Sequence, residues 1–141
     1  MRVFRLEDDE GNGVYRGIIA NAMTSYWRKY CTVSEASNTH PMPHMDKIFN
    51  VDENRKYEFL NSIAWPNDRY EVHQRFGFES VESYKNWVYE KLWRDNLTRG
   101  SEVHLCEYEV EEKYAIIGEK QLSFDKRFAS LVAVHKPNHF G

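Results

Sequence analysis

The chain has 141 residues and a mass of 16.9 kDa, which is the size of one domain built around one core. Nineteen basic and 22 acidic residues give a net charge of -3. This balance excludes a nucleic-acid-binding protein that relies on bulk positive charge, and it is too mild for a DNA mimic. We therefore predict that residues 1–141 form a single domain whose partner is a small molecule or a protein.

Neither a membrane segment nor a cysteine framework is predicted. The first residues alternate charge with apolar side chains, and no later apolar run reaches the length of a membrane span. We therefore expect a cytoplasmic protein. The two cysteines, Cys31 and Cys106, do not form a C-x-x-C pair, so we expect two buried free thiols instead of a zinc site or a disulfide.

The N-terminal half predicts a strand, a helix, a loop and a second helix. Residues 1–7 alternate as a strand does, with Val3 and Arg5 on one face and Phe4 and Leu6 on the other. From residue 18 to residue 30, apolar side chains recur every three or four positions, which predicts an amphipathic helix. Residues 34–45 are broken by prolines and predict a loop, whereas residues 52–63 favour a short helix.

Residues 76–87 predict a short strand that leads directly into a helix. Phe76, Gly77 and Phe78 favour extended backbone, and Ser80 suits the N-cap of a helix over residues 81–95 that buries Trp87. A serine at this place can cap the helix, or it can bind a phosphate or a ribose beside the helix N-terminus. The local sequence supports both interpretations.

After Gly100 the apolar period changes to two, which indicates strands. Residues 103 and 105 face one way, and residues 106, 108 and 110 face the other. Residues 114–124 predict two short strands or one bulged strand, residues 125–131 a helical turn, and residues from 135 a frayed tail. The fold class is therefore α+β, with two main helices packed on a curved, mostly antiparallel sheet.

Common catalytic motifs are missing from the sequence. His40 and His44 have the four-residue spacing of helical metal ligands, but they lie in the proline-rich loop, so we predict no metal site. The chain has no G-x-S-x-G elbow, no Walker loop and no G-x-G-x-x-G. Cys31 ends an apolar helical face and is better explained as buried than as a nucleophile.

A dispersed set of side chains suits a nucleotide. Arginine binds phosphates, aromatic rings stack on a base, and hydroxyl, amide or carboxylate groups hold ribose hydroxyls. Each residue also has a structural alternative, such as a surface ion pair, a hydrogen bond to the backbone or an exposed position on a strand. The candidate ligand-binding residues are Arg5, Tyr15, Arg16, His40, Phe78 and Ser80, and the candidate catalytic pair is Glu119 and Gln121.

Four short motifs are spread along the chain: Val-Tyr-Arg-Gly at 14–17, His-Pro-x-Pro-x-x-Asp at 40–46, Phe-Gly-Phe-x-Ser at 76–80 with Trp87, and Gly-x-x-Gln-x-x-Phe at 118–124. This set resembles a family of small proteins carried by bacteriophages and their hosts. The resemblance spans most of the chain, with an apparent insertion at residues 47–70, and it implies a location in the host cytoplasm but no activity.

The order of an early-strand arginine, a strand with serine leading into a helix, and a late acidic strand is also similar to the ADP-ribosyltransferase layout. That resemblance implies NAD as the cofactor, with Arg5 on its phosphates, Ser80 on the nicotinamide ribose, and Glu119 and Gln121 at the catalytic position. A neutral amide at Gln121 supplies no negative charge to a cationic transition state. Either Glu119 supplies that charge, or the site binds its ligand without this chemistry.

Two functional hypotheses follow. The first is a phage-type protein with an NAD-like nucleotide site, acting as an ADP-ribosyltransferase-like enzyme on a host target. The alternative is a non-enzymatic phage effector that inhibits a host protein by direct binding, with exposed Tyr and Trp side chains as anchors.

Overall fold

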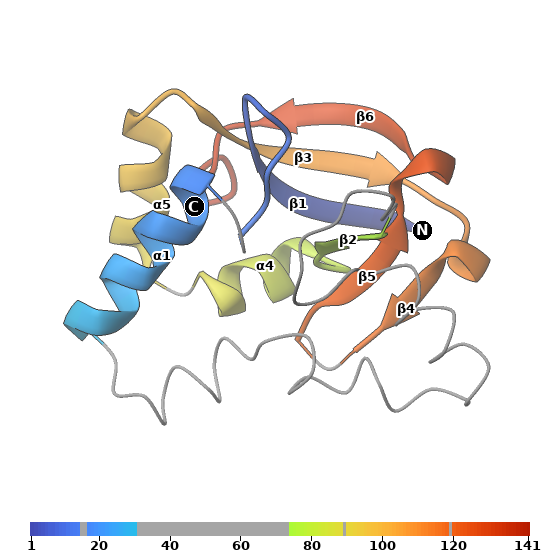
Figure 1. The fold of residues 1–141 in the computed structure, drawn as a ribbon, viewed down its shortest axis with the longest axis horizontal. Helices are drawn as coiled ribbons and strands as arrows, with labels where there is room; N and C mark the ends of the chain where they lie inside the picture. The colour runs from blue at the N-terminus through green and yellow to red at the C-terminus, as the bar shows by residue number, and fades with distance from the viewer. Residues whose placement is uncertain (15–16, 31–73, 89, 119) are drawn as a thin grey trace.

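The computed structural model describes residues 1–14, 17–30, 74–88, 90–118 and 120–141 (Figure 1). These residues form three α-helices, six strands and two short 3-10 helices. The elements in chain order are β1 (Arg2–Asp8), α1 (Gly17–Tyr30), β2 (Gln74–Gly77), α4 (Val81–Trp87), α5 (Lys91–Arg99), β3 (Val103–Glu109), η2 (Glu112–Tyr114), β4 (Ala115–Ile117), β5 (Leu122–Asp125), η3 (Lys126–Phe128) and β6 (Ser130–His135).

The strands form two antiparallel three-stranded sheets, with the orders β1-β3-β6 and β2-β5-β4. Two hydrogen bonds join the sheets, since the amide of Phe4 donates to Phe78 O (2.8 Å) and the amide of Phe78 donates to Phe4 O (2.7 Å). The backbones approach so closely that a Cβ on Gly77 would lie 2.7 Å from Val3 Cγ1 and 2.9 Å from Phe4 O. Glycine is therefore required where β2 meets β1.

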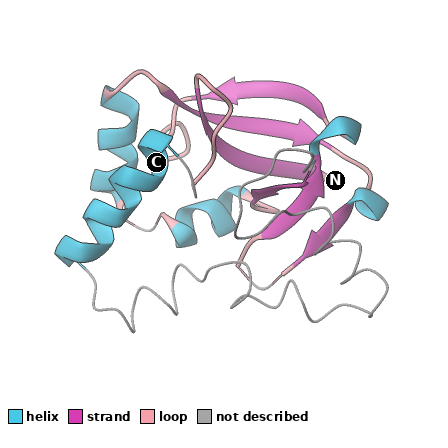
Figure 2. Ribbon diagram, viewed as in Figure 1, coloured by secondary structure: helices cyan, strands magenta, loops and turns pink. Residues whose placement is uncertain are grey.

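The three α-helices cover one face of the β1-β3-β6 sheet (Figure 2). Alternation along β1 and β3 directs one set of side chains to this face, where they meet the apolar side of each helix. The rings of Tyr84 and Trp87 lie 5.8 and 5.7 Å from the ring of Phe78. This helix-side core contains Phe4, Leu6, Val14, Ile19, Met23, Phe78, Tyr84, Trp87, Val88, Trp93, Leu97, Val103 and Leu105.

A second core lies on the other face of the same strands, between the two sheets. Apolar side chains from β1 and β3 pack there against β4 and β5, and the rings of Tyr108 and Phe124 are 5.7 Å apart. This inter-sheet core contains Val3, Cys106, Tyr108, Val110, Ala115, Leu122 and Phe124. β1 and β3 therefore each contribute to two cores.

The predicted α+β class is confirmed, as are the faces assigned to β1 and β3. Trp87 is buried as expected, with 1% of its surface exposed, and Cys106 is a buried free thiol. Residues 114–124 adopt the first of the two predicted alternatives, two short strands, and residues 126–128 form the predicted helical turn.

The single helix predicted over residues 81–95 is wrong. Residues 81–95 form two helices, because Val88 leaves the helical conformation (φ -101°, ψ 69°) and α5 begins only at Lys91. This break moves the buried face, so that Leu92 is exposed and Trp93 is buried. Residues 130–135 form a sixth strand, where no strand was expected.

The tail is also not frayed. Pro137 O accepts a hydrogen bond from Tyr84 Oη (2.7 Å), and the Asn138 side chain donates to Asp95 Oδ1 (2.9 Å). These bonds fasten the tail to α4 and α5.

The predicted loop at residues 34–45 and the predicted helix at 52–63 lie outside the described residues. Among the described residues, no helix is both long enough and apolar enough to cross a membrane.

Candidate functional site

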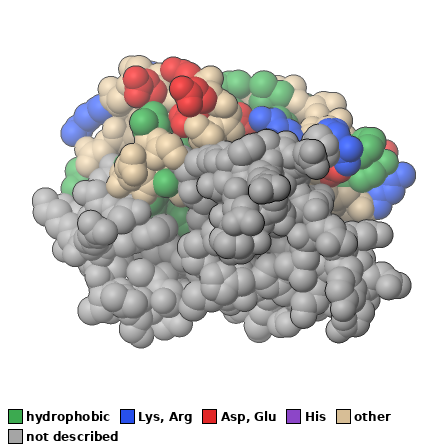
Figure 3. Space-filling view, in the orientation of Figure 1, with side chains coloured by type: hydrophobic (Ala, Val, Ile, Leu, Met, Phe, Trp, Pro, Cys, Tyr) green, Lys and Arg blue, Asp and Glu red, His purple; other side chains and the backbone are tan. Residues whose placement is uncertain are grey.

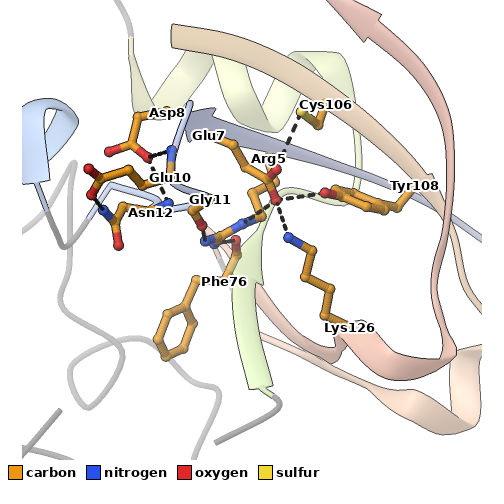
Figure 4. Close-up of polar contacts among 10 residues, drawn as sticks. All are labelled: Arg5, Glu7, Asp8, Glu10, Gly11, Asn12, Phe76, Cys106, Tyr108 and Lys126. Atoms are coloured by element: carbon orange, nitrogen blue, oxygen red, sulfur yellow. Dashed lines mark hydrogen bonds and ion pairs between the residues drawn. The ribbon is translucent and has the colours of Figure 1, made fainter. Parts of the chain in front are cut away.

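A cluster of charged and polar side chains lies between the two sheets, and its members are buried except Lys126, whose side chain is 34% exposed (Figure 4). Arg5 and Glu7 lie on the inter-sheet face of β1 and are only 5% and 8% exposed. Glu7 Oε1 accepts hydrogen bonds from Arg5 Nε (3.0 Å), Tyr108 Oη (2.6 Å) and Lys126 Nζ (3.0 Å). The Cys106 thiol donates to the second carboxylate oxygen at 3.6 Å. We call Arg5, Glu7, Cys106, Tyr108 and Lys126 the inter-sheet polar cluster.

The remaining donors of Arg5 bind the backbone. Its Nη1 donates to Phe76 O (2.7 Å) on β2, and its Nη2 donates to Gly11 O (3.2 Å) in the turn after β1. A Cβ on Gly13 would lie 2.6 Å from Arg5 Nη1, so the absence of a side chain at Gly13 makes room for the guanidinium. Arg5 thus connects one strand of each sheet and the first turn.

The environment of the cluster keeps its acidic groups in defined protonation states. Burial raises the pKa of Cys106 to about 12, and the neighbouring Glu7 charge adds to that shift. Burial, followed by the hydrogen bond to Glu7, also raises the pKa of Tyr108. For Glu7, burial acts to raise the pKa, but the Tyr108 hydrogen bond and the charges of Arg5 and Lys126 outweigh it, and the pKa is lowered.

These shifts determine the chemistry that the inter-sheet polar cluster can perform. At neutral pH Cys106 is a thiol and Tyr108 is a phenol, so neither is an activated nucleophile or a general base. Glu7 is a carboxylate whose charge is balanced by Arg5 and Lys126. The cluster is therefore suited to holding the two sheets together.

The predicted ligand-binding residues within the described parts of the chain do not share one surface. Arg5 faces the space between the sheets, whereas Phe78 is 2% exposed and packs in the helix-side core. Ser80 caps α4, because its Oγ accepts a hydrogen bond from the amide of Ser83 at 3.0 Å. The capping interpretation of Ser80 is confirmed, and ribose binding by the same hydroxyl stays a prediction.

The predicted catalytic pair is described only in part. Gln121 lies just before β5, is 4% exposed, and accepts a hydrogen bond on its backbone oxygen from the amide of Gly118 (2.9 Å). Glu119 lies outside the described residues, as do the ligand-binding candidates Tyr15, Arg16 and His40. An NAD site formed by these residues therefore stays a prediction.

Exposed apolar side chains follow β6. Four side chains from η3 and β6 are between 45% and 54% exposed, and we call them the β6 surface: Phe128, Leu131, Val132 and Val134. Figure 3 shows hydrophobic side chains along β6 at the upper edge and beside η2 and η3 at the right, where Lys and Arg side chains adjoin them. Patches of this kind on small proteins often mark interaction sites.

An aromatic pair extends the β6 surface. The rings of Tyr114 and Phe128 stack with their centroids 4.2 Å apart and an interplanar angle of 8°. Lys113 Nζ lies 5.0 Å from the Tyr114 ring, and the Arg127 guanidinium lies 5.4 Å from the Phe128 ring. The anchors expected for a protein-binding effector were Tyr and Trp. Among the residues whose burial the structure describes, Trp87 and Trp93 are each 1% exposed, whereas Phe128 and three aliphatic residues are exposed. Exposure of the remaining Trp side chains stays a prediction.

The comparisons with known proteins give a family. The family model described as "Bacteriophage T4 Y00F protein" matches residues 1–138. The chain belongs to the bacteriophage T4 Y00F family. No curated protein and no solved structure matches it. The resemblance to small bacteriophage proteins is thereby confirmed, whereas the similarity of this Y00F-family chain to ADP-ribosyltransferases has no support from the comparisons.

Sequence reasoning on the Y00F-family chain missed Glu7, Lys126 and the β6 surface. The alternation of Val3, Arg5 and Glu7 already indicated that two charges share a face with an apolar residue. The run Ser-Leu-Val-Ala-Val-His at residues 130–135 has the composition of a strand and could have predicted β6. Its position at the edge of the sheet could not have been read from the sequence, because that depends on pairing with β3.

Proposed function

We propose that this Y00F-family protein is a non-enzymatic phage effector that acts by binding a host protein through the β6 surface. The observation that carries the proposal is the exposure of Leu131, Val132 and Val134 on one short strand at the edge of a sheet. Keeping three large aliphatic groups in water is unfavourable, and burial against a partner relieves that cost at about 25 cal/mol per Å². Edge strands are also a common place for protein recognition.

Two further observations support binding over catalysis. The ionised groups of the inter-sheet polar cluster are occupied with one another, and its thiol and phenol are protonated at neutral pH. Arg5, the candidate phosphate ligand, directs donors to Glu7 and to two backbone oxygens. A nucleotide phosphate would have to displace those bonds, which argues for a function located on the surface.

The test compares two double variants that place the same charges on different faces. Val132→Lys with Val134→Lys charges the β6 surface. Ile18→Lys with Leu92→Lys charges two other exposed apolar residues, on α1 and α5, and serves as the matched control. Tagged wild type and both variants are incubated with bacterial lysate, and the recovered proteins are quantified by mass spectrometry.

We expect the wild type and the control to recover the same host protein, and the β6 variant to lose it. Circular dichroism and thermal unfolding verify that both variants are folded. Equal recovery by both variants would refute the β6 surface as the binding site.

The NAD hypothesis gives opposite results in a parallel experiment. It predicts heat on titration with NAD or ADP-ribose, nicotinamide release, and loss of turnover in Glu119→Gln, with no effect of the β6 variant. The effector proposal predicts no NAD-dependent heat and no nicotinamide release. Turnover that survives in the β6 variant and disappears in Glu119→Gln would establish the enzyme instead.

A further inference from the structure

We infer that the β6 surface receives an extended segment with acidic residues at both ends, which adds to the β1-β3-β6 sheet as a further strand beside β6. The inference rests on the proposed function and identifies the kind of partner. Three observations carry it: the open edge of β6, the apolar side chains along the strand, and the cations at its two ends.

The open edge follows from the sheet order. β6 pairs with β3 on one side, and among the described residues no strand pairs with the other side. Alternate N–H and C=O groups of an edge strand point away from the sheet and can pair with a further strand. An extended partner satisfies these groups, whereas the side of a helix presents none of its own backbone groups for pairing.

Apolar side chains along β6 supply the contact surface for the added strand. Leu131 pairs in register with Tyr108, and Val134 pairs with Cys106, so both continue the inter-sheet face of β3. Val132 is the extra residue of a β-bulge between them. A partner strand with β-branched side chains on one face would extend the inter-sheet core past β6.

Cations mark both ends of the strand. Residues 126–136 contain Lys126, Arg127 and Lys136, and no aspartate or glutamate. Lys136 is exposed and forms no ion pair with any described residue. Two of these cations already hold a carboxylate: Lys126 Nζ lies 3.0 Å from Glu7 Oε1, and Arg127 Nη2 lies 2.7 Å from Asp125 Oδ2.

This charge distribution favours an acidic partner over a second copy of the chain. Antiparallel pairing of two β6 strands would place the Arg127 end of one copy beside Lys136 of the other, and parallel pairing would place identical cations together. Like charges at both ends disfavour either arrangement. Carboxylates at the two ends of a partner strand would instead meet cations, which raises the rate of association and selects the partner.

The experiment uses the full chain and a displayed library of short random peptides. Wild type, Val132→Lys/Val134→Lys and the control Ile18→Lys/Leu92→Lys are each used for selection. We expect wild type and control to enrich peptides with Asp or Glu at both ends and β-branched residues between them, and the β6 variant to lose this enrichment.

The selected peptide is then synthesised and measured by fluorescence anisotropy against charge variants. Lys136→Glu is expected to weaken binding by at least about tenfold, and Arg127→Gln by less, because Asp125 already holds Arg127. Arg99→Glu changes an exposed cation on α5 and is expected to leave binding unchanged.

The outcomes separate this inference from the function on which it rests. If lysate capture requires the β6 surface but selected peptides lack acidic ends, or Lys136→Glu binds like wild type, the acidic-strand inference is wrong and the effector proposal stands. If neither capture nor selection depends on the β6 surface, both fail. A concentration-dependent dimer in analytical ultracentrifugation that is lost in the β6 variant would identify a second copy as the occupant.

Discussion

The two faces of the β1-β3-β6 sheet are built from the same strands but are stabilised in different ways. On the helix side, β1 contributes Phe4 and Leu6 to a core made of apolar residues. On the inter-sheet side, the neighbouring positions contribute Val3, Arg5 and Glu7, and two of those three are charged. The helix side is stabilised by removing apolar surface from water, whereas the inter-sheet side also depends on keeping buried charges paired.

The two faces should therefore differ in the substitutions that they tolerate. An apolar core loses stability in proportion to the volume removed from it, and the loss spreads over many contacts. A buried ion pair is stable only as a set, because removal of one partner leaves the other charged and dehydrated. The inter-sheet face ends at β6, where the apolar residues are exposed. It therefore combines buried charge at its centre with exposed apolar surface at its edge.

The largest loss of stability is expected from a substitution in the helix-side core. Trp87→Ala removes a ring that is 1% exposed and packed on Phe78, and should lower the free energy of unfolding by about 3–5 kcal/mol. Asn86→Ala, at an exposed position of the same helix, is the control and should change it by about 0.5 kcal/mol or less. Urea denaturation monitored by circular dichroism measures both, and a wild-type-like Trp87→Ala would contradict the helix-side packing.

On the inter-sheet side, a substitution that removes no volume should lower the free energy of unfolding almost as much. Glu7→Gln keeps the shape of the side chain but leaves Arg5 buried without its counter-charge, and should cost about 3 kcal/mol. Glu109→Gln removes a carboxylate from an exposed ion pair and should cost about 1 kcal/mol or less. Equal losses in the two variants would mean that burial does not distinguish these carboxylates.

The same carboxylate predicts how stability depends on pH. The pKa of Glu7 is lower in the folded protein than its ordinary value of 4.5, so the unfolded chain binds more protons between the two values. The stabilisation from Glu7 is therefore complete above pH 4.5 and is lost as the pH falls through the folded pKa. The difference in unfolding free energy between wild type and Glu7→Gln should narrow in acid; a constant difference between neutral and acidic pH would contradict the shift.

The cap of α4 should have a smaller effect, and it tests the nucleotide hypothesis at the same residue. Ser80→Ala removes the acceptor of the Ser83 amide and should cost about 1 kcal/mol, whereas Ser80→Asp should retain the cap. Thermal unfolding measures both variants. If Ser80 also binds a ribose, Ser80→Asp would keep its stability and lose NAD affinity in calorimetry, which a purely structural serine would not do.

The smallest effect on stability is expected from substitutions on β6, at the edge of the β1-β3-β6 sheet. Val132→Lys with Val134→Lys changes exposed side chains and should alter the free energy of unfolding by about 1 kcal/mol or less, since each change at such a site contributes about 0.5 kcal/mol or less. A much larger loss would show that these side chains belong to the inter-sheet core. The β6 surface would then need a different explanation.

Periodicity was sufficient to predict the elements that alternate or repeat regularly. The two faces of β1 and β3, the helix that begins near Ile18 and the burial of Trp87 all follow from the spacing of apolar residues. The end of α4 did not, because Val88 turns its backbone oxygen toward Arg94 Nη1, an interaction that joins two helices. Spacing alone cannot predict a contact of that kind.

The candidate site was less predictable than the fold. Arg5 was identified, but as a phosphate ligand, because one of its partners, the backbone oxygen of Phe76, becomes a neighbour only after the two sheets have come together. The β6 surface was missed because no strand was predicted between the helical turn at residues 125–131 and the tail from residue 135, where β6 spans Ser130–His135. Exposure is a property of the sheet order, and the sheet order is set by long-range pairing.

The pairing of β1 with β3 has a consequence for synthesis on the ribosome. Glu7 and its hydrogen-bond partner Tyr108 are 101 residues apart in sequence, and Glu7 and Lys126 are 119 apart. At a translation rate of about 5–20 residues per second, Glu7 is synthesised roughly 5–20 seconds before Tyr108. During that interval Glu7 lacks the donors of Tyr108 and Lys126, and β1 has no β3 to pair with. We therefore expect the β1-β3-β6 sheet to form late, because its pairing requires the closure of a long chain segment.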